Sequence, residues 1–382
     1  MMKIGMLGCG TVGSGVLEIV RKRDDMSIRG ILTKHPHPEL GSLSVQDPGA
    51  ILDDPEIDTV VEVMGGTDPA LNYVKRAISN GKNVVTANKQ LIAEAYTELV
   101  SSAAEHGVAL RCTAAVGGGI PWLVNLSRVA EMFAVTRFYG IMNGTTNFIL
   151  DAMDEDGKDF AEALSEAQKL GYAEADPSAD VDGLDAMRKC LISADIAFGG
   201  VFTEDDALTE GIRHILPEDI DCAKEHGMAC RLMAEGVKTA KGAALFVQPE
   251  FLPNDRLEAS VKKNFNMISL ETEETGRMSF YGQGAGKFPT AGNVVGDLID
   301  ICGGTKDFYT DKVGALAADN GAEVMRWYFR TSAEDGWLAD AADENWGAGV
   351  LTKPLSVAEA HAHAAKMKAS DGGMFFAGVR MK

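Results

Sequence analysis

The sequence lacks several features that mark membrane-spanning, secreted or zinc-binding proteins. It has no long uncharged apolar run and no basic segment followed by an apolar core at its start, so neither a membrane-crossing helix nor a secretion signal is predicted. Its six cysteines form no Cys-x-x-Cys pair, which argues against a zinc site or a disulfide framework. We therefore expect no membrane partner and a cytoplasmic protein with reduced thiols.

Positive charge is also scarce, with 36 Lys and Arg against 56 Asp and Glu and a formal net charge of −20. Binding to nucleic acid needs a clustered basic surface, so no nucleic-acid partner is expected. The composition is 46% hydrophobic and 24% charged, which is typical of globular proteins. A chain of 382 residues usually folds into more than one domain.

The order of apolar segments divides the chain into an α/β protein of three regions. Over residues 1–142 short β-rich runs alternate with helical patterns, which predicts a Rossmann-type parallel sheet. Residues 143–283 begin with helices and continue with strands, which predicts a central α+β domain, and a helix in about 284–316 could return to the first domain. Residues 323–382, with a helix at 337–345, predict a small β-α-β-α-β module.

A Gly-x-Gly-x-x-Gly motif lies between a predicted strand and a predicted helix near the start of the chain. Gly8 permits a tight turn, Gly10 allows a pyrophosphate to approach the backbone, and Gly13 allows the helix to pack closely on the strand. Thr11 and Val12 begin the helix, whose free N–H groups can bind an anion. The motif predicts a dinucleotide site, and the alternative is a glycine-rich turn that binds nothing.

The end of the second predicted strand bears on cofactor choice. It ends in Leu32, Thr33, Lys34 and His35, without the carboxylate that binds the ribose of NAD. The cation at Lys34 would tolerate or favour a 2′-phosphate, so the sequence predicts NADP or NAD, with NADP slightly favoured. The alternative for Lys34 is a solvated loop lysine.

Two lysines are candidates for proton transfer. Asp185 and Lys189 lie four residues apart on a predicted helix with apolar neighbours, where a partly desolvated ammonium group could stabilise and protonate the oxygen formed when a carbonyl is reduced. Lys89 follows a predicted parallel strand, at the edge of the sheet where ligands bind. The alternatives are an ordinary surface ion pair and a solvated lysine at a helix start.

Six segments of the sequence occur, in this order, at residues 8–13, 86–89, 114–121, 143–147, 171–189, and 282–286 with 290–291. Together they resemble the homoserine dehydrogenase family, in the order that family shows, over about residues 1–316. The resemblance implies reversible NAD(P)(H)-dependent interconversion of L-aspartate 4-semialdehyde and L-homoserine, on the branch to threonine and methionine, by a homodimer with a Rossmann domain and a substrate-binding and dimerisation domain. Two alternatives stay open, another amino-acid or semialdehyde dehydrogenase on the same scaffold and a non-catalytic dinucleotide-binding relic.

The resemblance also implies residue roles. The catalytic residues would be Lys189, Lys89 and Asp185. The substrate would be bound by Glu174, Asp180, Gly171 and Thr145. The cofactor would be bound by Gly8, Gly10, Thr11, Val12, Gly13, Lys34, Gly65, Thr86, Lys89 and Gly286. Backbone carbonyls would coordinate Na⁺ or another monovalent cation at Thr113, Val116, Gly118 and Ile120.

The sequence departs from the family pattern in several places. Thr113 stands where the family usually has glutamate, Thr33 and Lys34 replace a usual arginine, and Lys287 and Gly292 interrupt the late glycine motif. Some members end in a βαββαβ regulatory (ACT-like) domain. We expect the shorter tail here to be a reduced, ligand-free relative used for packing or assembly.

Overall fold

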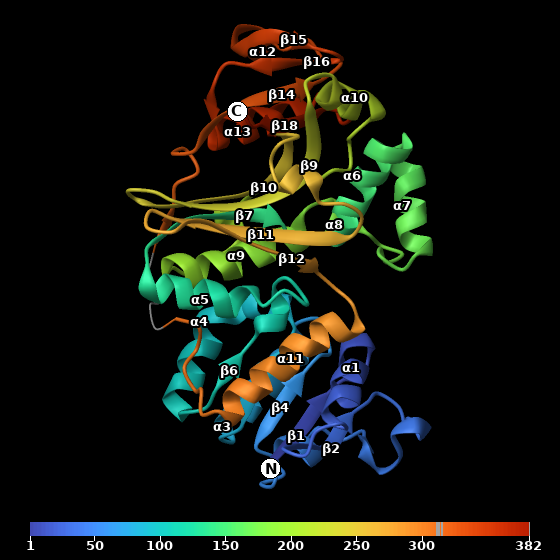
Figure 1. Cartoon of the computed structure of the whole chain (residues 1–382), viewed down its shortest axis with the longest axis vertical. Helices are drawn as coiled ribbons and strands as arrows, with labels where there is room; N and C mark the ends of the chain where they lie inside the picture. Colours follow the sequence, from blue (N-terminus) through green and yellow to red (C-terminus); the bar gives the residue numbers. More distant parts are fainter. Residues whose placement is uncertain (311–313, 315, 382) are drawn as a thin grey trace. The chain divides into compact units, whose positions relative to one another are not determined.

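The computed structural model describes residues 1–310, 314 and 316–381. The chain divides into two compact units (Figure 1), with unit 1 formed by 1–132, 195–201 and 283–315, and unit 2 by the rest. It passes from one unit to the other within α9 (Leu184–Phe198). Within the described residues, no helix is long and apolar enough to cross a membrane.

Unit 1 contains a parallel sheet in the order β3-β2-β1-β4-β5-β6. This is the Rossmann strand order, which reverses between β1 and β4 and places a ligand site at their carboxyl ends. Buried valines on the neighbouring strands β4 and β5, such as Val60 and Val84, explain why these segments form interior strands. The strands are β1 (Met2–Leu7), β2 (Met26–Leu32), β3 (Ser44–Val45), β4 (Thr59–Glu62), β5 (Asn83–Thr86) and β6 (Leu110–Arg111).

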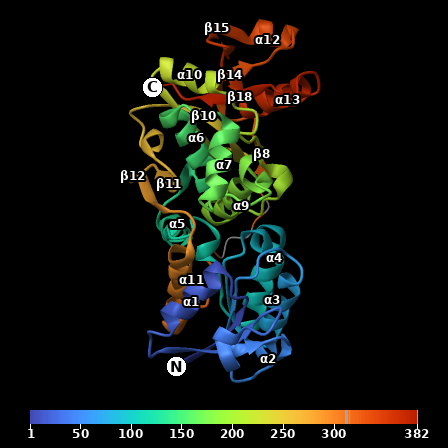
Figure 2. The ribbon, with the colours of Figure 1, turned by 90° about the vertical axis from the view of Figure 1, so that its right-hand side faces the viewer.

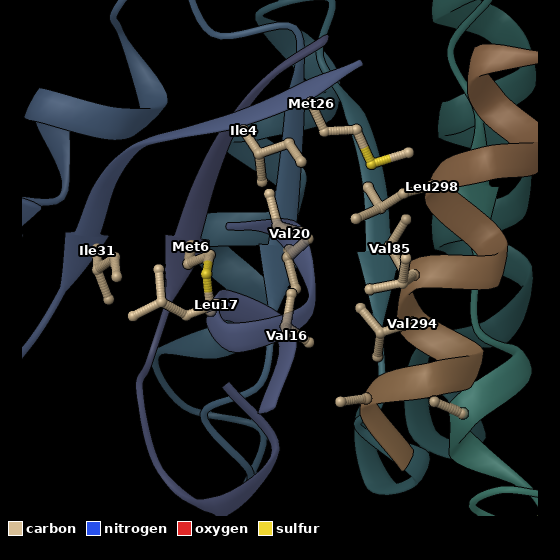
Figure 3. Packing of buried hydrophobic residues seen from close by; sticks show 14 of the residues in the cluster. Ile4, Met6, Val16, Leu17, Val20, Met26, Ile31, Val85, Val294 and Leu298 are labelled. Carbon is tan, nitrogen blue, oxygen red and sulfur yellow. The ribbon is translucent and has the colours of Figure 1, made fainter. Parts of the chain in front are cut away.

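Helices cover both faces of this sheet, and Figure 2 shows α3 and α4 on the side opposite α1 and α11. The core beneath α1 and α11 joins Val16, Val20, Val294 and Leu298 (Figure 3). A Cβ on Gly15 would lie 2.7 Å from the Lys287 carbonyl oxygen, so glycine permits this close packing. The helices are α1 (Thr11–Val20), η1 (Pro38–Leu43), α2 (Gly49–Leu52), α3 (Ala70–Ser79), α4 (Lys89–His106), η2 (Thr113–Ala115), α5 (Trp122–Met132) and α11 (Lys287–Cys302).

Unit 2 is built on a mixed sheet whose main path runs β12-β11-β7-β9-β10-β18-β14-β16-β15. Residues 133–142, assigned above to the first domain, carry β7, which pairs with β9 and β11 of this sheet. The central strands are β7 (Val135–Ile141), β9 (Met228–Lys238), β10 (Gly242–Pro253), β11 (Phe265–Thr272) and β12 (Gly276–Gln283), with β8 (Leu208–Thr209) and β13 (Ala317–Ala318) beside β10. The helices are α6 (Gly144–Asp156), α7 (Phe160–Lys169), α8 (Ser178–Val181), α9, η3 (Glu204–Asp206), α10 (Pro217–Glu225) and η4 (Glu258–Ser260).

The C-terminal segment corrects the expected β-α-β-α-β order, because the structure has three strands between its two helices and runs β-α-β-β-β-α-β. The predicted helix at 337–345 ends at Ala341, and the chain then forms a strand that ends at the buried Trp346. Gly347, at φ 56°, makes the hairpin turn that pairs Trp346 with Gly349, so pairing and burial override the helix propensity of the alanines. The elements are β14 (Val324–Arg330), α12 (Gly336–Ala341), β15 (Ala342–Trp346), β16 (Gly349–Thr352), β17 (Leu355–Ser356), α13 (Val357–Lys368) and β18 (Phe375–Val379).

This segment is part of the unit 2 sheet, because β18 pairs with β10. Next to that junction, the Arg380 guanidinium contacts the carboxylates of Glu235 at 2.6 Å, Glu250 at 2.8 Å and Glu323 at 3.3 Å. Arg137 also contacts Glu235. Burial raises the pKa of Glu250, so the cation at Arg380 is needed to offset a desolvated carboxylate.

Candidate functional site

The glycine turn after β1 is shaped to receive an anion. Gly8 has φ 102°, and a Cβ on Gly13 would lie 2.7 Å from the Gly8 carbonyl oxygen. A Cβ on Gly10 would meet nothing within 4 Å among the described residues, so this turn leaves open space above Gly10. Thr11 and Val12 open α1, whose first turn carries no acidic residue. The turn therefore fits a dinucleotide pyrophosphate.

A buried acid organises the ends of β4 and β5. The Glu62 carboxylate accepts hydrogen bonds from the Thr86 hydroxyl at 2.5 Å and the Met64 N–H at 2.7 Å, and burial raises its pKa. Gly65 follows with φ 79°. Sequence analysis missed Glu62, and the signal was available, because an acid that ends an apolar parallel strand lies at the ligand-binding edge.

Asn88 fixes the start of α4, where Lys89 is the first residue. The Asn88 Oδ1 accepts the Leu91 N–H at 3.1 Å, and its Nδ2 donates to the Gly66 carbonyl at 2.6 Å. This N-cap sets the direction in which α4 leaves the sheet. Lys89 is half-buried there, so it is held at the same edge of the sheet as Thr86.

The residues after β2 lie at the surface of unit 1. Lys34 is exposed, one residue beyond the point where the Thr33 N–H donates to the Val45 carbonyl of β3 at 2.9 Å. The Thr33 hydroxyl lies 2.8 Å from the hydroxyl of Ser44. These contacts fix the backbone before Lys34 and leave its ammonium group accessible to a negatively charged ligand.

In unit 2, Lys189 and Asp185 form a buried ion pair on α9. The Lys189 Nζ donates to the Asp185 Oδ2 at 2.7 Å and to the Met142 carbonyl at 2.6 Å. An ammonium group has three N–H bonds, so within the described residues these contacts leave one for a substrate oxygen. The surface-pair alternative is excluded, because Lys189 is only 8% and Asp185 5% exposed.

Asn143 joins this pair to a second acid. Its Nδ2 donates to the Asp180 Oδ1 at 2.7 Å and the Asp185 Oδ2 at 2.8 Å, while its Oδ1 caps α6 by accepting the Thr146 N–H. Burial and the nearby Asp185 carboxylate raise the pKa of Asp180. Sequence analysis gave Asn143 no role, although it precedes a helix and is a favoured cap residue.

The other proposed substrate residues lie on α6 and in the turn after α7. The Thr145 hydroxyl donates to the Tyr172 carbonyl at 2.6 Å, which ties α6 to this turn. Gly171 turns the chain with φ 75°. Glu174 is exposed, and the Gln168 side chain holds its backbone carbonyl at 3.0 Å.

The proposed cation loop, residues 113–120, lies against α11. Gly286, with φ 127°, precedes this helix. The carbonyl oxygens of Gly118 and Ile120 both accept hydrogen bonds from the Asn293 side chain on α11, so at these two positions the residues present do not fit a cation. Nor, within the part of the chain that is described, do three or more His, Cys, Asp or Glu side chains gather as a metal site.

The site residues thus form two groups. The glycine turn, Lys34, the β4 and β5 ends with Lys89, and the loop beside α11 belong to unit 1. Asp180, Asp185, Lys189 and Asn143 make contact with one another or share a partner in unit 2.

Comparison with known proteins identifies the family. Residues 8–113 match the family model described as "Homoserine dehydrogenase, NAD binding domain", and residues 121–299 match "Homoserine dehydrogenase". The homoserine dehydrogenase of Synechocystis sp. is 41% identical over 79% of this chain and 73% of its own length. That of Corynebacterium glutamicum is 39% identical over 89% of this chain and 82% of its own.

A solved homoserine dehydrogenase from Thiobacillus denitrificans has a similar structure, with a TM-score of 0.88 and 32% identity over 99% of this chain and 98% of the other. This similarity includes the C-terminal segment, because nearly all of both chains is covered. It agrees with the Rossmann strand order and the mixed sheet described above. The chain therefore belongs to the homoserine dehydrogenase family, whose members are oxidoreductases that act on a CH–OH group.

Proposed function

We propose that this protein interconverts L-aspartate 4-semialdehyde and L-homoserine, with Lys189 as the general acid and base. The observation that carries the proposal is the buried cluster of Lys189, Asp185, Asn143 and Asp180. Two fixed acceptors orient the Lys189 ammonium group, and its third N–H bond is available to stabilise and protonate the substrate oxygen during reduction. In the oxidation direction the same nitrogen, as the neutral amine that proton donation leaves, accepts the proton from the hydroxyl group.

The carboxylates near this lysine would bind the remainder of the substrate. A four-carbon amino acid carries an ammonium group, which Glu174 and Asp180 can bind as anions. Thr145 and Gly171 shape the turn that presents Glu174. Asp185 has a positioning role, because its Oδ2 already holds both Lys189 and Asn143.

The dinucleotide would be held by Gly8, Gly10, Thr11, Val12 and Gly13, together with Lys34, Gly65, Thr86, Lys89 and Gly286. When bound, it supplies or accepts the hydride. The exposed ammonium group of Lys34 favours a 2′-phosphate, so NADP is the preferred cofactor in this proposal, with NAD also accepted.

Lys89 is proposed to act on the same substrate as Lys189. It belongs to unit 1 and Lys189 to unit 2, so this part of the proposal needs its own test. Turnover of the Lys89→Ala and Lys189→Ala variants and of the double variant forms a thermodynamic cycle. Strong non-additivity supports a shared reaction step, and fully additive losses contradict it.

The same family membership supports a place in threonine and methionine biosynthesis, a cytoplasmic location and a homodimer. Light scattering after gel filtration tests the dimer directly. A molar mass equal to that of one chain across the working concentration range would contradict it.

The decisive experiment follows reduced-nicotinamide absorbance with L-homoserine and either NAD⁺ or NADP⁺, and the reverse reaction with aspartate semialdehyde. Turnover faster with NADP⁺ is expected. A panel of other amino alcohols and semialdehydes tests the alternative substrates. Dinucleotide binding by calorimetry without turnover on any of them would support a non-catalytic relic instead.

A further inference from the structure

A side-chain amide lies where the proposed cation loop gathers its oxygens. The Asn293 Nδ2, on α11, donates to the Gly118 carbonyl at 2.6 Å and to the Ile120 carbonyl at 2.9 Å. Two carbonyl oxygens therefore converge on a single nitrogen. Gly118, with φ 53°, adopts the left-handed conformation, which glycine reaches without strain and which helps to turn the loop backbone at this point.

The lone pairs at Ile120 are fully used. Its carbonyl oxygen also accepts the Trp122 N–H at 2.7 Å, in addition to the Asn293 amide. A carbonyl oxygen has two lone pairs. A cation at this position would have to displace one of these two hydrogen bonds.

The other end of the loop is held by the same helix. One turn further along α11, the Asp297 carboxylate accepts the Thr113 N–H at 2.9 Å and the Thr113 hydroxyl at 2.6 Å. Asn293 and Asp297 are four residues apart and so share a helix face. This face thus contacts both the first and the last residues of the loop. A coordinated cation would hold the two ends of the loop together in the same way.

We propose that Asn293 takes the place of a monovalent cation in this loop, so that the protein folds and works without one. The two N–H bonds of the amide satisfy the oxygens that would otherwise coordinate the ion. Effects on turnover rest on the proposed function, whereas effects on thermal stability and ion binding do not.

The test compares NaCl and KCl with choline chloride at equal ionic strength, reading the melting temperature and ²³Na relaxation. The wild-type protein is expected to melt at the same temperature in all three salts, to leave ²³Na relaxation unchanged, and to keep the same kcat. A saturable rise in melting temperature or kcat that is specific to Na⁺ or K⁺ would overturn the proposal.

The Asn293→Ala variant removes both hydrogen bonds and opens the space to an ion. Its melting temperature is expected to fall in choline chloride and to recover, saturably, in NaCl or KCl. Asn293→Asp gives a second measurement, because its carboxylate faces the two carbonyl oxygens and needs a cation between them. If both variants melt equally in all salts, the amide does not replace an ion and the proposal fails.

Asn125→Ala is the matched control. The Asn125 Nδ2 also donates to a carbonyl of the same region, that of Pro121 at 2.6 Å, but not to Gly118 or Ile120. The melting temperature of the Asn125→Ala variant is expected to be the same in the three salts. A cation-specific recovery in this control would show a general salt effect and remove the support that the Asn293 variants give.

Discussion

The Nζ of Lys189 lies 2.7 Å from the Oδ2 of Asp185, and their side chains are only 10% and 7% exposed. Removal of either partner of a buried ion pair is costly, because it leaves the other charge uncompensated, so each of these two side chains holds the other in place.

Replacement of Lys189 by alanine should reduce kcat by about 10²- to 10⁴-fold, the usual contribution of a general acid and base. Steady-state kinetics and the melting temperature are the measurements. Lys82→Ala is the matched control, because Lys82 is also buried and donates to two carbonyls, of Asp54 and Ile57. It should lower the melting temperature and leave kcat unchanged. A normal kcat in the Lys189→Ala variant would show that Lys189 is not the proton donor.

Replacement of Asn143 by aspartate should destabilise the protein more at pH 8 than at pH 5. The new carboxylate would face Asp180, whose pKa burial and Asp185 already raise, so like charges repel once all are ionised. As pH falls, protonation relieves the repulsion, and the difference in melting temperature from wild type should shrink. Asn143→Ala, which adds no charge, is the control, and its difference in melting temperature from wild type should depend less on pH. Equal pH dependence of the two variants would contradict this account.

Two glycine variants separate cofactor binding from folding. Gly10→Ala adds a Cβ into space with no atom of the described chain within 4 Å, so it should weaken dinucleotide binding with little change in melting temperature. Gly13→Ala brings a Cβ to 2.7 Å from the Gly8 carbonyl and should lower the melting temperature of the free protein. Calorimetric titration and thermal melts test both. Normal binding by Gly10→Ala would place the pyrophosphate elsewhere.

Replacement of Lys34 by glutamate should raise the KM for NADP⁺ by about tenfold or more, which corresponds to about 1.4 kcal/mol. The KM for NAD⁺, which has no 2′-phosphate, should change little. Lys22→Glu makes the same charge change at another exposed position and controls for net charge. If both variants respond alike, the effect comes from the overall field and not from contact with the phosphate.

Replacement of Arg380 by alanine should cost about 3–5 kcal/mol of unfolding free energy, because the buried Glu250 loses its cationic partner. Since burial raises the pKa of Glu250, its protonation at low pH should make the loss smaller at pH 5 than at pH 8. Arg213→Ala, which breaks a half-exposed pair with Asp182, should cost at most about 1 kcal/mol. Equal losses, measured by denaturant unfolding, would show that the C-terminal segment is not held by this cluster.

The sequence alone determined the local features of the protein. The glycine motif, the valine-rich strands and the helix that carries Asp185 and Lys189 are encoded by residues close together in the chain, so spacing and periodicity were sufficient. The order of the six motif segments along the chain also pointed to the family that the comparisons identify.

Only the tertiary structure decided the contacts between distant residues. Asn143 contacts Asp185, 42 positions away, and Asn293 contacts Gly118, 175 positions away. The periodicity of a sequence does not predict contacts between residues so far apart. The strand at 342–346 likewise forms against its own helix propensity, because pairing with β16 and burial of Trp346 outweigh it. Secondary-structure propensity depends on a few neighbouring residues, whereas desolvation and strand pairing depend on which distant segments the whole fold places next to one another.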